Sequence, residues 1–292
     1  MYDEHTWMQN AIAEFAHADT KQKIAYLENF YLRLRPLPIK IQTLICDVAG
    51  QSPPADNDGD QMKWRHAIIG ALSRCDEMKQ PAIALLCNYL YSSIWHLRGS
   101  AAISLGKLGV DDTAIISRIG DLLSDHEGND EFVHEYALIA LTHLGRAGRQ
   151  ELSKILDLAN NFLLEEGNGW DNSTAYLPDC LANLEVRTPE VFDILCSIVR
   201  EHRYFSHDAC LALALLDAPA ELAKPAIAGY LLSDEFYIYE ASKLHELINA
   251  LINVAEGDHA IIMQCLEHLC NDCNTEMASI AWEYLDRMRR LA

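Results

Sequence analysis

The fold is decided by two similar stretches, LRGSAAISLGKLG at residues 97–109 and VHEYALIALTHLG at residues 133–145. They align without a gap at an offset of 36 residues, and both end in Leu-x-x-Leu-Gly. Apolar residues spaced three and four apart line one face of an α-helix, and small residues among them let a second helix approach closely. Gly109 and Gly145 follow the last apolar residue, where helices commonly end. Each stretch therefore predicts a helix that packs on one face and stops at its glycine.

Weaker copies of this pattern occur at residues 65–72, 206–216 and 244–251. We call the helices that carry the pattern B helices. Amphipathic segments that we call A helices alternate with them, at residues 81–90, 113–123, 151–164, 190–199, 220–232 and 260–270. None of these helices could bury its apolar stripe alone, whereas hairpins stacked on hairpins bury every stripe in one continuous core. We therefore predict an all-α fold, a right-handed α-solenoid (an α-α superhelix) of about six to seven stacked helical hairpins.

The run from Asp111 to Gly145 resembles a HEAT repeat of the phycobilisome-lyase-like class. Repeats of that class have an aspartate after a turn, an apolar first helix, and then Val-Arg-x-x-Ala-x-x-Ala-Leu-x-x-Leu-Gly. Leu97-Arg98 and Val133-His134 occupy the Val-Arg position, and His134 departs from the arginine of the class. The resemblance is strongest over residues 80–145. It implies an armadillo-like α-solenoid and specifies no activity.

We expect residues 1–292 to form a single HEAT-like α-solenoid domain. Residues 1–60 supply an N-terminal helical cap, with helices at 7–18, 21–34 and 39–48, followed by a proline-containing acidic loop. The repeats occupy residues 61–274, and residues 275–292 form a C-terminal capping helix. Open solenoids need such caps because a terminal repeat has no neighbour to cover its outer face.

The net charge of the chain indicates which classes of partner it can bind. The chain has 43 acidic and 23 basic residues and a formal net charge of −20. Such a charge repels phosphate backbones and attracts basic surfaces, so we expect no nucleic-acid partner and favour a basic one. A solvated acidic surface that only keeps the protein soluble is the alternative interpretation.

The cellular setting is also indicated by composition. The first residues, Met1 to Trp7, are polar and acidic rather than a signal peptide, and no apolar run reaches membrane-spanning length. The nine cysteines mostly occur in apolar helical stretches, as expected for buried thiols in a reducing compartment. We therefore expect a cytoplasmic protein with no membrane partner.

The exposed first turns of the B helices supply the candidate binding residues, because B helices usually line the concave face of a solenoid. The candidates are Trp64, Arg65, Trp95, Arg98, His134, Glu135, His207, Asp208, His245 and Glu246. Trp170 is a further candidate in an irregular loop. Tryptophan and arginine are enriched at interface hot spots, so the sequence predicts a protein-binding module or scaffold. As alternatives, Trp64 and Trp95 pack between hairpins, Arg98 bonds a neighbouring turn aspartate, and the protein is an immunity-type inhibitor of a basic toxin.

A metal-dependent enzyme is the alternative of a different class. His-Glu pairs occur at residues 126–127, 134–135 and 245–246, and the HEAT-like deoxyhypusine hydroxylases build a di-iron site from four such pairs. The fourth pair is missing here, since positions 207 and 208 are His-Asp. Cys270 and Cys273 form a lone CxxC without the second half of a zinc site. We therefore predict no catalytic residue, metal or cofactor.

Overall fold

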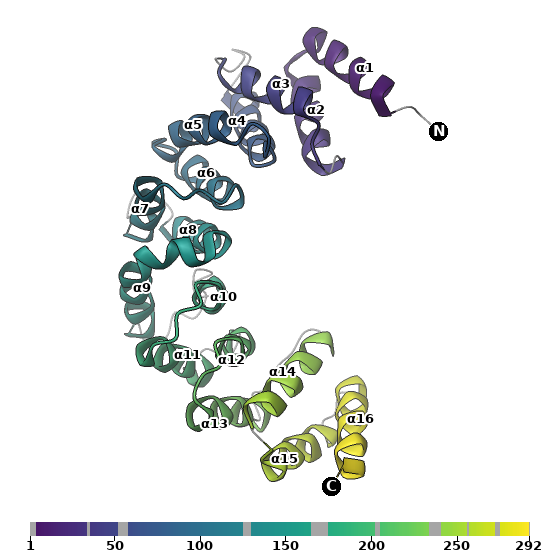
Figure 1. Cartoon of the computed structure of the whole chain (residues 1–292), viewed down its shortest axis with the longest axis vertical. Coiled ribbons are helices and arrows are strands. Elements are labelled where there is room, and N and C mark those ends of the chain that lie inside the picture. Colours follow the sequence, from purple (N-terminus) through teal and green to yellow (C-terminus); the bar gives the residue numbers. More distant parts are fainter. Residues whose placement is uncertain are drawn as a thin grey trace. The chain divides into compact units, whose positions relative to one another are not determined.

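The computed structural model describes residues 4–33, 36–51, 58–124, 130–164, 175–201, 205–233, 241–255, 257–271 and 275–291. These residues lie almost entirely in α-helices, and no strand occurs among them (Figure 1), which confirms the all-α prediction. No helix within the described ranges has both the length and the apolar character needed to cross a membrane. The chain divides into two compact units, Met1–Glu151 and Leu152–Ala292. Each unit is described by itself, and the single-domain assignment stays a prediction.

The first unit contains two layers of helices. Its elements are α1 (Glu4–His17), α2 (Thr20–Arg33), α3 (Ile39–Ala49), α4 (Asp58–Leu72), α5 (Lys79–Leu90), α6 (Trp95–Lys107), α7 (Thr113–Asp121), η1 (Leu122–Ser124), α8 (Asp130–Leu144) and η2 (Gly145–Glu151). One layer is formed by α2, α4, α6 and α8, each packed on the next, and the other by α3, α5 and α7. The layers are joined because α5 also packs on α6, and α7 on α8.

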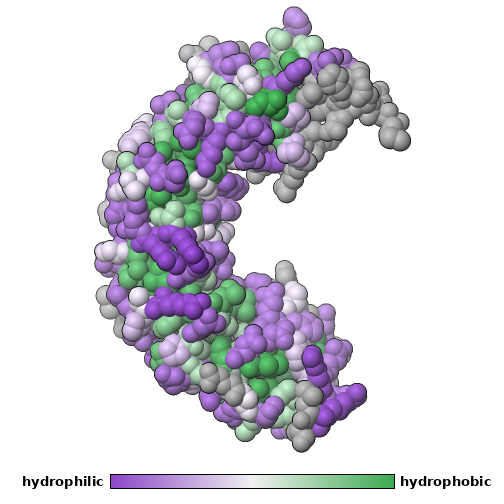
Figure 2. All heavy atoms as spheres, in the orientation of Figure 1, coloured by the Kyte–Doolittle hydropathy of each residue, from purple (hydrophilic) through white to green (hydrophobic). Residues whose placement is uncertain are grey.

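The second unit repeats this arrangement. Its helices are α9 (Leu152–Leu164), α10 (Leu177–Asn183), α11 (Pro189–Glu201), α12 (Ser206–Leu215), α13 (Ala220–Leu231), α14 (Ala241–Val254), α15 (His259–Cys270) and α16 (Thr275–Leu291). One layer runs through α9, α11, α13 and α15, and the other through α10, α12, α14 and α16. Figure 2 shows hydrophilic and hydrophobic residues interspersed over the visible face of each unit.

The predicted helices agree with the observed ones to within a few residues, because each was defined by a long apolar period. The short helix α10 has no counterpart among them, since its seven residues cannot display that period. Gly109 ends α6 with φ +62°, and the Val110 amide donates to the Leu105 carbonyl at 3.4 Å, as in a Schellman cap. Asp112 then caps α7 by accepting from the Ala114 amide at 2.8 Å. The stop that the sequence predicted at Gly109 is thus present, and Asp112, next to the Asp111 of the repeat pattern, starts the following helix.

Helices α6 and α8 approach each other closely. A Cβ added at Gly106 would lie 2.6 Å from the carbonyl oxygen of Ala140 and 3.0 Å from its Cα. The two backbones therefore touch at this point, and no side chain fits between them. Ala101 and Ala137 are fully buried in the same helices. The small residues of the repeat pattern thus allow the close packing that the sequence predicted.

Substitution of Gly106 tests this contact. We expect Gly106→Ala to lower the free energy of unfolding by about 1–3 kcal/mol, because α8 must shift to admit the methyl group. Alanine is the better helix former by about 1 kcal/mol, so a substitution without a clash would have the opposite sign. Gly229→Ala in α13 is the matched control, since a Cβ there meets no atom within 4 Å. The midpoint of urea denaturation measures both, and equal stabilisation by the two variants would contradict the close contact.

Candidate partner-binding surface

Five helices of the B layers share one register, which begins within the first two turns of each helix. The first position of this register is buried in every one of these helices, and it is occupied by Trp64, Leu97, Val133, Ser206 and Leu244. The next position is polar, and it is occupied by Arg65, Arg98, His134, His207 and His245. Four positions after the first, a second buried residue follows, and this set is Ile68, Ala101, Ala137, Cys210 and Ile248. Trp64 therefore occupies a core position, as the packing alternative requires.

Three of the polar residues in this register are buried. Arg98 is 3 % exposed, and its Nη1 donates to the Ser92 carbonyl at 3.0 Å, which ties the start of α6 to the turn before it. This acceptor is a backbone carbonyl, and a bond from Arg98 to a neighbouring turn aspartate stays a prediction. His134 and His207 are 7 % and 6 % exposed. Burial favours a packing role for these side chains, and contact with a partner stays a prediction for the set.

Trp95 has a different environment, because it belongs to a continuous row of rings. Its ring stacks on Phe132 and Tyr136 of α8, with centroids 5.7 and 6.3 Å away, and meets the edge of His96 at 5.2 Å. His96 in turn stacks on His66 of α4 at 5.1 Å. We call these five residues the aromatic row. It joins α4, α6 and α8, and Phe132 is 37 % exposed.

The rings of the aromatic row are held in place by their neighbours. A Cβ added at Gly99 would lie 1.8 Å from Cδ2 of Tyr136, so the Tyr136 ring packs directly on the backbone of α6. His96 Nε2 lies 3.0 Å from Sδ of Met62 in α4. Burial, and secondarily the nearby His96, lower the pKa of His66, which favours a neutral ring at pH 7. The row is therefore a rigid and largely uncharged surface.

Sequence reasoning identified Trp95 but missed the other members of the row. A usable signal was present, because Phe132 is displaced by 36 residues from His96 and both precede the first buried residue of a B helix. Tyr136 and His66 carried no comparable signal, since their contacts come from neighbouring helices.

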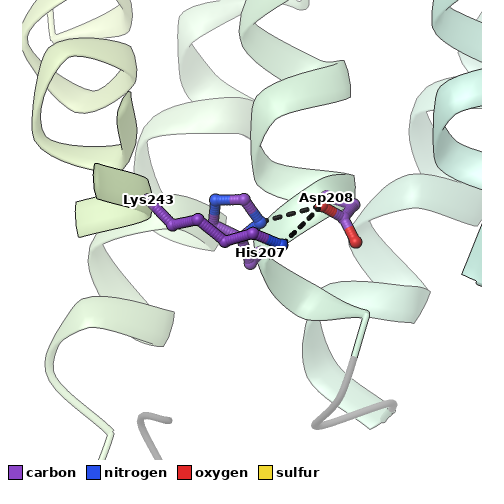
Figure 3. Close-up of polar contacts among 3 residues, drawn as sticks. All are labelled: His207, Asp208 and Lys243. Carbon is purple, nitrogen blue, oxygen red and sulfur yellow. Dashed lines mark hydrogen bonds and ion pairs between the residues drawn. The ribbon is translucent and has the colours of Figure 1, made fainter. Parts of the chain in front are cut away.

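In the second unit, His207 belongs to a charged cluster that joins α12 and α14. Its Nδ1 lies 2.8 Å from Oδ1 of Asp208, and the Lys243 Nζ lies 3.9 Å from the same oxygen (Figure 3). The carboxylate therefore accepts from the Nδ1–H, while the buried Nε2 of His207 has no hydrogen-bond partner among the residues that the structure describes. Burial, followed by repulsion from Asp208, raises the pKa of Asp179 in α10. The cluster thus leaves a carboxylate pair incompletely compensated.

The remaining candidate binding residues belong neither to the aromatic row nor to the charged cluster of α12 and α14. His245 Nδ1 is 3.4 Å from the Tyr284 hydroxyl, which itself donates to Oδ1 of Asn249 at 3.2 Å. Glu246 is exposed, whereas Arg65 and Glu135 are half-buried. Trp170 lies outside the described residues.

The cysteines and the metal-ligating side chains within the described ranges form no reactive or metal-binding centre. The eight cysteines in these ranges form no disulfide with one another. Burial raises the pKa of Cys265 to about 11 and that of Cys210 well above its usual value, so both stay as unreactive thiols. No group of three or more His, Cys, Asp or Glu side chains is placed there to hold a metal ion. His126, Glu127 and Cys273 lie outside the described residues.

Comparison with known proteins gives no family: the sequence matches no protein-family model and no curated protein.

The raised pKa of Asp179 predicts a pH-dependent effect of its removal. A carboxyl whose pKa is raised by folding destabilises the folded state when it is ionised, and this effect disappears below its unfolded pKa of about 3.9. We therefore expect Asp179→Asn to raise the melting temperature at pH 7 and to leave it unchanged near pH 3. Asp157→Asn, at an exposed site of α9, should show no such pH-dependent difference. An equal effect of Asp179→Asn at both pH values would contradict the raised pKa of Asp179.

Proposed function

We propose that the protein is a cytoplasmic protein-binding module or scaffold, built as a right-handed HEAT-type α-solenoid, that binds a partner through its B helices. The proposal is supported by the two layers of helices within each unit, since in HEAT solenoids one such layer forms the binding surface. The single observation that carries it is the aromatic row across α4, α6 and α8. Three successive B helices contribute rings to one partly exposed surface.

The physical properties of the aromatic row suit protein recognition. Aromatic side chains bury a large area for few rotatable bonds, and they dominate interface hot spots. These rings are already immobilised by stacking and by the backbone at Gly99, so little side-chain entropy remains to be lost on binding. Exposure of an apolar ring such as Phe132 to water is unfavourable, and its burial against a partner is favourable. The row therefore provides a preorganised centre for an interface.

The net charge of −20 selects among partners for this surface. Electrostatic complementarity mainly accelerates encounter and excludes like-charged competitors. We infer a basic protein as the partner, and a basic toxin inhibited by this module is one such class.

Truncation of the exposed ring tests the proposal. Proteins retained by the immobilised chain are identified and purified, and their dissociation constants are measured for wild type and Phe132→Ala. Loss of a hot-spot aromatic costs about 2 kcal/mol, so we expect binding to weaken more than about tenfold with little change in the unfolding midpoint. Trp282→Ala is the matched control, because Trp282 is a 51 % exposed aromatic of α16 outside the row. Equal affinity of both variants for the partner would argue against the aromatic row as the binding surface.

Salt dependence tests the electrostatic part separately. We expect the association rate to fall between low and physiological ionic strength, because exposed charges are screened beyond about 8 Å at 0.15 M. Surface plasmon resonance at several salt concentrations measures this rate. A specific partner that binds without salt sensitivity would contradict charge-driven capture.

A further inference from the structure

A second surface with the properties of a binding site lies in the other layer of the second unit. A groove of about 570 Å³ runs between α11 and α13, which pack side by side in this layer (Figure 1). Its apolar lining includes Val199 of α11 and Leu222 of α13. None of the residues of the aromatic row takes part in it.

The groove stays open because α13 presents small residues to it. Pro225, Ala226 and Gly229 line this wall. A Cβ added at Gly229 would meet no atom within 4 Å, so the groove has room for a side chain from elsewhere. Pro225 has no backbone N–H, and the Glu221 carbonyl four residues earlier therefore lacks its usual helical donor. The α13 wall thus combines free space with a backbone acceptor.

The polar groups around the groove are mainly acidic. Asp193 and Glu201 of α11 and Glu221 of α13 line it, and none of the three has an ion-pair or hydrogen-bond partner within the described part of the chain. Arg200 also lines the groove, but it is bound to its own helix. Its Nε donates to the Cys196 carbonyl at 3.1 Å, and its Nη2 donates to the Ser197 hydroxyl at 3.1 Å. Three exposed carboxylates and one arginine therefore surround an apolar floor, so the groove has a net negative charge.

We propose that this groove binds an arginine side chain of a basic protein partner. The aliphatic stem of arginine would cover the apolar floor, while its five N–H donors would reach the carboxylates and the Glu221 carbonyl. Lysine offers a single point charge and suits several acceptors less well. The charge of this unit agrees, since 23 of the 43 acidic residues but only 9 of the 23 basic residues fall in Leu152–Ala292. This inference adds a second contact to the proposed function and does not depend on the aromatic row.

A steric variant provides the first test. The probe is a fluorescein-labelled peptide, Gly-Ser-Leu-Arg-Ser-Leu-Arg-Ser-Gly, titrated with the full chain and followed by fluorescence anisotropy. We expect Gly229→Leu to fill the groove and weaken binding at least about tenfold without a change in net charge. Its unfolding midpoint should be equal to or above that of wild type, because leucine is a better helix former than glycine. Unchanged peptide affinity in this variant would overturn the proposal.

A pair of charge-matched triple variants provides the second test. Asp193→Asn with Glu201→Gln and Glu221→Gln removes three negative charges at the groove. Asp157→Asn with Glu190→Gln and Glu283→Gln removes three exposed charges elsewhere in the same unit. We expect the groove triple to weaken binding at least about tenfold and the control triple less than about threefold. Equal weakening would show non-specific attraction to an acidic surface and would overturn the site.

The same titration separates this inference from the proposed function. Phe132→Ala should bind the peptide as wild type does, because the aromatic row belongs to other helices. If Phe132→Ala lowers the affinity for the peptide while Gly229→Leu does not, the arginine peptide binds the aromatic row, and the groove is not its site. A peptide with lysine in place of both arginines should bind several-fold more weakly, and equal affinity would contradict guanidinium recognition.

Discussion

The packing of α6 on α8 through Gly106 and Ala140 is the constraint on which the first unit depends. With two backbones in contact, the positions of all other side chains on these helices relative to one another are set. Gly99 lies two turns earlier on α6 and brings Tyr136 against the same backbone. The aromatic row is thus a consequence of close helix packing, because Trp95 can stack on Phe132 and Tyr136 only when α8 lies near α6. The partly exposed aromatic row is thus built on a close contact between two helices.

The second unit differs from the first in where its charged groups lie. Its layer of α10, α12 and α14 contains a histidine, a lysine and two carboxylates at the junction of three helices. Its other layer leaves three carboxylates unpaired around a groove. Unpaired carboxylates do little for folding stability, and they repel one another. Their concentration beside an open apolar floor is the reason to consider a basic partner rather than a structural role.

Two surfaces of different chemistry therefore carry the binding proposal. The aromatic row offers rigid apolar area, which mainly slows dissociation once a partner is bound. The groove offers charge and hydrogen-bond acceptors, which mainly select the partner.

The sequence by itself determined the helices, the stop at Gly109 and the all-α class, because these follow from local periodicity and capping. It also indicated Trp95 as a candidate. Only the tertiary structure decided which polar residues of the repeat are exposed. Arg98, His134 and His207 are buried by neighbouring helices, and no local pattern reports that burial. The aromatic row and the groove between α11 and α13 likewise join residues from separate helices. Their existence depends on how closely those helices approach, which is a property of packing rather than of any one segment.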